Sequence, residues 1–196
     1  MDAYSELPSS SPWKPTLDPA ASALTGMEID RLVDGVTVTT HCLDGRKRQV
    51  TASILIPVDA ETLWQVLTDY EGLADFIPNL SSSRLLPHPS GGIRLEQVGG
   101  QRILKINFSA RVVLDMTEDS PHRIDFTIVE GDFKEFSGYW QLTPQDGGTK
   151  LTYFLEVRPK LTMPVKVLEC RLNIDLPRNL VAIYQQALLP RVWVST

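Results

Sequence analysis

The chain has 196 residues, of which 42% are hydrophobic and 22% are charged, enough for one globular domain of ordinary size with a substantial core. The formal net charge is −5, from 19 basic and 24 acidic residues, and the longest basic stretch is Arg46-Lys47-Arg48. This balance excludes the electrostatic footprint of a nucleic-acid-binding protein, so no nucleic-acid partner is expected.

The two cysteines, Cys42 and Cys170, have neither CxxC spacing nor neighbouring His and Cys residues. The sequence therefore predicts no metal, no cofactor and no obligatory disulfide. The first 15 residues carry early acids and no apolar signal core, and no run approaches the roughly 18 apolar residues of a transmembrane helix. We expect a soluble, unexported protein in the reducing cytoplasm.

Residues 1–22 contain four prolines and several serines. This composition buries too little apolar surface to offset backbone ordering, so it predicts a flexible tail ahead of a domain at 23–196. Trp13 in the tail is either a solvent-exposed aromatic residue or a docking residue for the domain or a partner.

A hairpin is predicted at the start of the domain. Residues 36–40 alternate between apolar and polar, Asp44-Gly45 is a strong turn signal, and residues 49–54 resume the strand pattern. Pro57 has no amide to continue a ladder, and Asp59 is suited to cap a helix that begins there. The apolar residues Leu63, Val66 and Leu67 share one face of that helix.

An antiparallel meander is predicted for the middle of the chain, because short segments of alternating pattern are separated by glycine and proline turns. In the longest segment, residues 104–116, apolar side chains occupy every second position and so share one face. Gly99-Gly100 is read as one of the turns. The predicted strands cover 84–87, 93–98, 102–116, 123–130, 133–143 and 150–158.

Helical periodicity returns after Pro164. Asp175 is predicted as the N-cap, with Pro177 in the first turn, where proline is tolerated. This helix is the obvious cover for the apolar face of the sheet. Its predicted apolar face comprises Leu176, Leu180, Ile183, Tyr184, Ala187 and Leu188.

Three segments carry a resemblance to a known superfamily: residues 57–70 (PVDAETLWQVLTDY), 76–80 (FIPNL) and 175–180 (DLPRNL). The chain resembles the START/Bet v 1-like (SRPBCC) superfamily over residues 48–189, especially its polyketide cyclase/dehydrase and coenzyme Q-binding branch. The resemblance implies an α+β helix-grip fold: a curved antiparallel sheet wrapped around a long C-terminal helix, with two short helices after the first strand.

The resemblance also implies a hydrophobic-ligand cavity between the sheet and the last helix, whereas the local patterns alone are equally explained by a filled core. Phe76, Ile77 and Met163 are expected at the cavity mouth, where transient membrane contact is left open. Tyr153 and Tyr184 are the expected polar groups of the cavity. The predicted cavity residues are Phe108, Val112, Leu114, Phe126, Ile128, Trp140, Tyr153, Leu155, Leu180 and Tyr184.

No catalytic residue is predicted. His41, His88 and His122 fall in turns or at a strand start, and neither a nucleophile motif nor a phosphate loop is present. Glu130, Asp132 and Glu135 surround a glycine turn, and they would suit general acid-base chemistry only if one of them were buried in the cavity.

Three functions remain open on this basis. The first is binding or transport of a hydrophobic small molecule such as a lipid, quinone or isoprenoid. The second is a cyclase or dehydratase that shapes an aromatic or polyketide substrate without a strong catalytic motif. The third is a protein-interaction module that uses the N-terminal tail. Neither the ligand nor the oligomeric state follows from the sequence.

Overall fold

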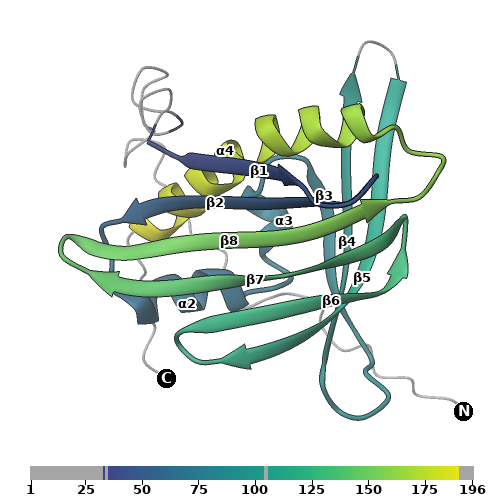
Figure 1. Cartoon of the computed structure of the whole chain (residues 1–196). Coiled ribbons are helices and arrows are strands. Elements are labelled where there is room, and N and C mark those ends of the chain that lie inside the picture. Colours follow the sequence, from purple (N-terminus) through teal and green to yellow (C-terminus); the bar gives the residue numbers. More distant parts are fainter. Residues whose placement is uncertain (1–32, 34, 104–105, 190–196) are drawn as a thin grey trace, which may run out of the picture.

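A computed structural model describes residues 33, 35–103 and 106–189, without the side chains of 101–103 and 106–108 (Figure 1). The tail predicted at 1–22 lies outside the described residues. The elements in chain order are β1 (Thr37–Cys42), β2 (Arg48–Ile56), α2 (Ala60–Thr68), α3 (Leu73–Phe76), β3 (Leu80–Leu86), β4 (Ile93–Ile103), β5 (Ile106–Asp119), β6 (Arg123–Gly131), β7 (Phe133–Gln145), β8 (Gly148–Pro159) and α4 (Val165–Leu188).

The strands form one eight-stranded sheet in which all neighbours are antiparallel, in the order β1-β2-β8-β7-β6-β5-β4-β3. The predicted hairpin around Asp44-Gly45 is confirmed as the β1–β2 pair. The β1–β2 hairpin joins the rest of the sheet by pairing with β8, so the first two strands lie beside the last strand of the chain (Figure 1).

The start of α2 follows the local sequence. The backbone N–H of Thr62 donates a hydrogen bond of 2.6 Å to Asp59 Oδ1, which confirms Asp59 as the N-cap. Leu63, Val66 and Leu67 are buried, as their spacing predicts. These contacts fix the position of α2 against the sheet.

The turn predicted at Gly99-Gly100 is wrong. β4 continues through both glycines to Ile103, with Gly99 opposite Ala110 and Gly100 opposite Ser109. The backbone N–H of Gly100 donates to the carbonyl oxygen of Asn79 at 2.8 Å, so a second segment packs directly against this part of the strand. The glycine pair therefore allows a close backbone approach within a strand.

The predicted start of the last helix is also wrong. α4 begins at Val165 after Pro164, which places Asp175 and Pro177 inside the helix. Pro177 removes the backbone hydrogen bond that would reach the carbonyl of Asn173. The helix continues because its apolar residues Leu168 and Leu176 are buried on the same face.

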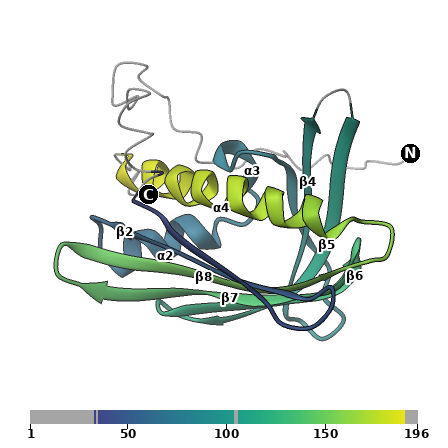
Figure 2. The ribbon, with the colours of Figure 1, turned by 45° about the horizontal axis from the view of Figure 1, so that its top comes forward.

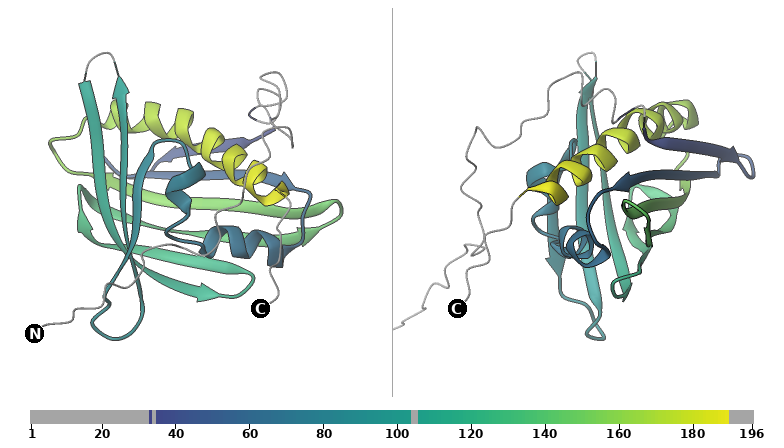
Figure 3. Two further views of the ribbon diagram at one scale, coloured as in Figure 1. Left: turned by 180° about the vertical axis from the view of Figure 1, so that it is seen from behind. Right: turned by 90° about the vertical axis from the view of Figure 1, so that its left-hand side faces the viewer.

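α4 lies along the concave side of the curved sheet, and β4 and β5 rise beside its N-terminal half (Figure 2). α2 and α3 lie on the same side and contact α4 (Figure 3). The helix-grip fold is thus confirmed. On α4, Leu180 and Ile183 are fully buried, whereas Leu188 is 43% exposed. No helix among the described residues is long and apolar enough to cross a membrane.

Candidate functional site: an apolar cavity with one polar end

A cavity of about 290 Å³ lies between the sheet and α4. The inner faces of β4 to β8 form its floor, and α4, Leu67 of α2 and Leu73 of α3 form the other walls. Five aromatic side chains line the floor: Phe126, Phe133, Phe136, Trp140 and Tyr153. The ring centroids of Trp140 and Tyr153 lie 4.4 Å apart, and those of Phe126 and Tyr153 lie 5.7 Å apart.

Six of the ten residues predicted for the cavity line it: Val112, Leu114, Phe126, Trp140, Tyr153 and Leu155. Ile128 and Tyr184 are partly buried and pack against the core, and Leu180 is fully buried there; none of these three lines the cavity. Phe108 belongs to β5, but its side chain lies outside the described part. Most of the predicted residues therefore surround a shared space.

The three predicted mouth residues separate in the structure. Ile77 lines the cavity. Phe76 is partly buried against the core, and Met163 is 8% exposed; neither lines the cavity. Leu161, two residues before Met163, is 88% exposed. The two loop segments therefore do not present Phe76, Ile77 and Met163 as one exposed patch.

Tyr153 combines deep burial with an unsatisfied hydroxyl. The residue is 8% exposed and lines the cavity. Within the described residues its hydroxyl has no hydrogen-bond partner, and burial alone raises the pKa of the phenol. Because buried phenols normally find a partner, this hydroxyl is available to a molecule in the cavity.

The cavity has a polar end that sequence reasoning did not predict. Asp175 and Arg171, one turn apart on α4, form an ion pair of 3.1 Å, and Asn79 Nδ2 lies 3.3 Å from Asp175 Oδ1. Asn179, with its amide oriented to satisfy both partners, donates to the carbonyl oxygens of Asp175 at 3.2 Å and Pro78 at 3.3 Å. All four side chains belong to cavity-lining residues, and we call them the polar cluster.

Burial raises the pKa of the Asp175 carboxyl, against the opposing effect of Arg171 and Arg178. The side chains of Arg171 and Asp175 are 11% and 19% exposed. A sequence signal was present, because the i,i+3 and i,i+4 spacings of a helix place Arg171, Asp175 and Asn179 on the same face as four apolar residues. These apolar residues are Leu168, Leu172, Leu176 and Ile183.

Two more polar residues line the cavity near α3. The Tyr70 hydroxyl donates to Glu118 Oε1 at 2.6 Å, and the pKa of Tyr70 is raised, mainly by burial and then by that hydrogen bond. Gln97 Nε2 lies 3.3 Å from Ser83 Oγ, which in turn donates to the carbonyl oxygen of Tyr70 at 2.6 Å. These groups are satisfied within the protein, so they mainly fix the wall of the cavity.

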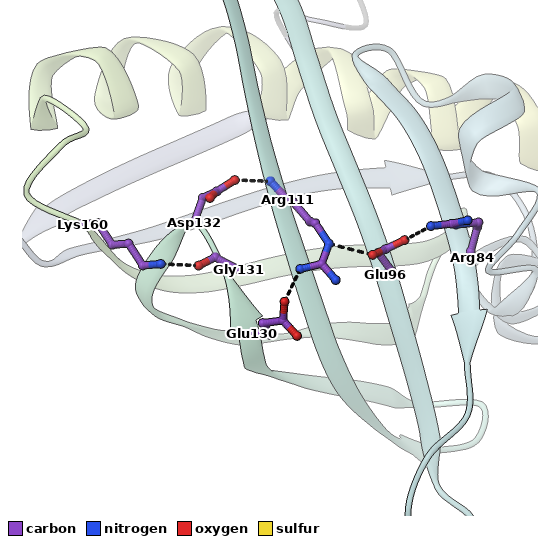
Figure 4. Close-up of polar contacts among 7 residues, drawn as sticks. All are labelled: Arg84, Glu96, Arg111, Glu130, Gly131, Asp132 and Lys160. Carbon is purple, nitrogen blue, oxygen red and sulfur yellow. Dashed lines mark hydrogen bonds and ion pairs between the residues drawn. The ribbon is translucent and has the colours of Figure 1, made fainter.

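The carboxylates considered for acid-base chemistry do not line the cavity. Glu130 Oε1 lies 2.6 Å from Arg111 Nη1, and Asp132 accepts from the Arg111 backbone N–H at 2.7 Å (Figure 4). Arg111 also pairs with Glu96 at 2.7 Å. Arg111 alternates along β5 with the cavity residues Ala110 and Val112, so this network lies on the outer face of the sheet.

The remaining candidates for acid-base chemistry also lie away from the cavity. Glu135 pairs with Arg158 at 2.8 Å. His88 Nε2 lies 3.3 Å from Asp115, and His41 and His122 are exposed. None of these residues contributes to the cavity lining among the described residues.

Comparisons with known proteins agree with this geometry. Residues 56–183 match the sequence model of a family described as polyketide cyclase / dehydrase and lipid transport. A relative named ribosome association toxin RatA, from Rickettsia prowazekii (strain Madrid E), is 20% identical over 133 residues, which cover 68% of this chain and 91% of the relative.

Two solved structures share the fold. The Zhui aromatase/cyclase from Streptomyces sp. R1128 is 17% identical with a TM-score of 0.62, covering 72% of this chain and 93% of its own. A STAR-related lipid transfer protein from Xanthomonas axonopodis is 16% identical with a TM-score of 0.62, and the match covers 79% of this chain and 94% of that protein's chain. The superfamily resemblance is thereby confirmed, and the chain belongs to the polyketide cyclase / dehydrase and lipid transport family of START/Bet v 1-like proteins.

Proposed function

We propose that this protein binds or transports a small apolar molecule in the cavity between the sheet and α4. The observation that carries the proposal is a space of about 290 Å³ lined mostly by apolar and aromatic side chains, among them the buried residue Tyr153, whose hydroxyl has no hydrogen-bond partner among the described residues. A filled core would leave such a hydroxyl unpaired at a cost of about 1–3 kcal/mol. A bound molecule with an acceptor or donor would remove that cost.

The volume limits the ligand. A cavity of about 150 Å³ is large enough to hold benzene, and the present one is about twice that size. It therefore suits one or two fused rings or a short branched chain better than a phospholipid with two acyl chains. Burying about 300 Å² of apolar ligand surface contributes about 7 kcal/mol of favourable binding free energy. The translational and rotational freedom that the ligand loses on binding reduces this contribution. Apolar contact alone thus supports binding in the micromolar range or weaker.

The first test is native mass spectrometry of gently purified protein, with organic extraction and identification of any released molecule. A stoichiometric apolar molecule of one or two rings, or of comparable volume, supports the proposal. Protein that is reproducibly empty, and that also fails to take up an added apolar probe, would contradict it.

The second test blocks the cavity from within. Ala110 lines the cavity in β5, and its neighbour Ser109 is exposed on the opposite face of the same strand. Ala110→Trp is expected to abolish binding of 2-methylnaphthalene, followed by isothermal titration calorimetry, while Ser109→Trp leaves it unchanged. Circular dichroism of both variants checks the fold. Unfolding of Ala110→Trp alone would indicate a close-packed core instead of an open cavity.

A cyclase or dehydratase is the second candidate. It is favoured by the desolvated carboxyl of Asp175 and the buried phenol of Tyr153, two proton-exchanging groups that line the same cavity. The extracted molecule, incubated with the protein and analysed again by mass spectrometry, separates the two functions: a carrier returns it unchanged and an enzyme alters it.

The ribosome association named for one relative is not extended to this chain. The net charge of −5 disfavours binding to the phosphates of ribosomal RNA. The tail-dependent interaction module involves residues outside the described part, and deletion of residues 1–22 followed by a partner-binding assay would test it.

A further inference from the structure

We infer that the polar cluster of Arg171, Asp175, Asn79 and Asn179 holds a hydroxyl group of the bound molecule through the Asp175 carboxylate, so that the ligand is a small ring or short-chain alcohol or phenol. This inference rests on the proposed function, because it names the chemistry of the molecule that occupies the same cavity.

The cluster joins two parts of the chain at one end of the cavity. Arg171, Asp175 and Asn179 project from successive turns of α4, and Asn79 comes from the loop between α3 and β3, which packs beside α4 (Figure 3). Asn79 adopts a positive φ of 67°, a backbone conformation that costs free energy for most residues but is tolerated by asparagine. The contact between Asn79 and Asp175 compensates for that cost and orients both side chains.

The two charges within the cluster balance, and Arg178, the other cation that acts on Asp175, is exposed to solvent. The Asp175 carboxylate faces the Arg171 guanidinium at 3.1 Å, and both side chains are largely shielded from water. A charged ligand group would leave one unpaired charge in a poorly hydrated space, which is costly. Burial already raises the pKa of Asp175, so the environment resists a second negative charge. An anionic head group such as a carboxylate or phosphate is therefore disfavoured.

An uncharged oxygen avoids this penalty. A hydroxyl can donate to the Asp175 carboxylate, whose oxygens can each accept more than one hydrogen bond. Hydrogen bonds to charged groups are stronger than those between neutral groups. With about 290 Å³ available, the rest of the molecule has space for about two fused rings against the aromatic floor.

The experiment compares three probes of similar size by isothermal titration calorimetry at pH 7: 2-naphthol, 2-methylnaphthalene and 2-naphthoate. The full chain is expected to bind 2-naphthol about tenfold more tightly than 2-methylnaphthalene, the effect of one added hydrogen bond to a charged group. It is expected to bind 2-naphthoate more weakly than 2-naphthol.

Two variants assign the preference to the cluster. Asp175→Asn and Arg171→Met each preserve approximate side-chain size, and each is expected to reduce the preference for 2-naphthol to less than threefold while the affinity for 2-methylnaphthalene stays within twofold. Lys166→Gln, at an exposed position of the same helix, is the matched control and should retain the full preference.

The results that would contradict these expectations each refute a different part of the inference. Equal binding of 2-naphthol and 2-methylnaphthalene by the unchanged chain, or a preference that survives in both variants, would refute the role of the cluster while leaving the cavity function in place. Tighter binding of 2-naphthoate than of 2-naphthol would refute the uncharged head group. Failure of all three probes to bind would overturn the proposed function itself.

Discussion

Gly138 in β7 lies so close to Phe154 in β8 that a Cβ atom on Gly138 would stand 2.0 Å from the Phe154 carbonyl oxygen and 2.9 Å from Cζ of Phe126. The absence of a side chain at this position lets the Phe126 ring lie across β7 beside Tyr153. The aromatic floor of the cavity therefore depends on one glycine in the middle of a strand.

Gly138→Ala is expected to lower the free energy of unfolding by about 3 kcal/mol, because the new methyl group must displace backbone or an aromatic ring. Urea unfolding followed by tryptophan fluorescence measures the change. Gly99→Ala is the matched control, since its Cβ would find its nearest neighbour at 3.5 Å. A similar stability for the two variants would show that β7 and β8 can separate at Gly138 without cost.

The two buried tyrosines of the cavity wall should respond differently to loss of the hydroxyl. Tyr70→Phe removes a hydrogen bond of 2.6 Å to Glu118 and is expected to cost about 1–2 kcal/mol in unfolding free energy. Tyr153→Phe removes a hydroxyl without a partner among the described residues, so it is expected to be neutral within about 0.5 kcal/mol or stabilising. Chemical denaturation of ligand-free protein tests this contrast, and an equal loss in both variants would reveal a hidden partner of Tyr153.

Alkaline pH should destabilise the fold through the same two residues. Burial raises the pKa of Tyr70 and Tyr153 above the ordinary value of 10.0. The folded protein therefore retains phenolic protons that the unfolded chain releases, and stability is lost as pH rises above about 10. Each such tyrosine contributes a slope of about 1.4 kcal/mol per pH unit. Urea titrations between pH 9 and 11 measure the free energy of unfolding, which is expected to fall less steeply with pH in Tyr153→Phe than in the unchanged chain. Identical slopes for the two proteins would contradict burial of the phenol.

At acidic pH the cap of α2 should weaken. The Thr62 backbone N–H lowers the pKa of Asp59 below its ordinary value of 3.8, so this contribution to stability is present above about pH 4 and is lost as pH falls through the lower pKa of the folded state. Asp59→Ala is expected to cost about 1 kcal/mol at pH 7.

Asp59→Asn provides the control for charge, because asparagine caps a helix without titrating. Its stability should change less than that of the unchanged chain between pH 5 and pH 3. Thermal unfolding across this range provides the comparison, and parallel curves for the two proteins would exclude Asp59 as a source of the acid sensitivity.

Local chemistry in the sequence determined much of the fold. The period of two along residues 150–158 predicted a strand because successive side chains of a strand point to opposite faces. Asp59 predicted the start of a helix because one carboxylate satisfies an exposed backbone N–H three residues later. Six cavity residues followed from the shared inner face of these strands together with the family resemblance.

Only the tertiary structure decided the outcomes that depend on distant partners. Gly99-Gly100 is locally suited to a turn, but pairing with Ala110 and Ser109 holds it in a strand. Asp175 is locally suited to cap a helix, but burial of Leu168 extends α4 toward its N-terminus and turns Asp175 toward Asn79, 96 residues away. Whether an apolar face encloses a filled core or a cavity depends on how side-chain volumes fit across the whole fold, and no local pattern in a sequence encodes that sum.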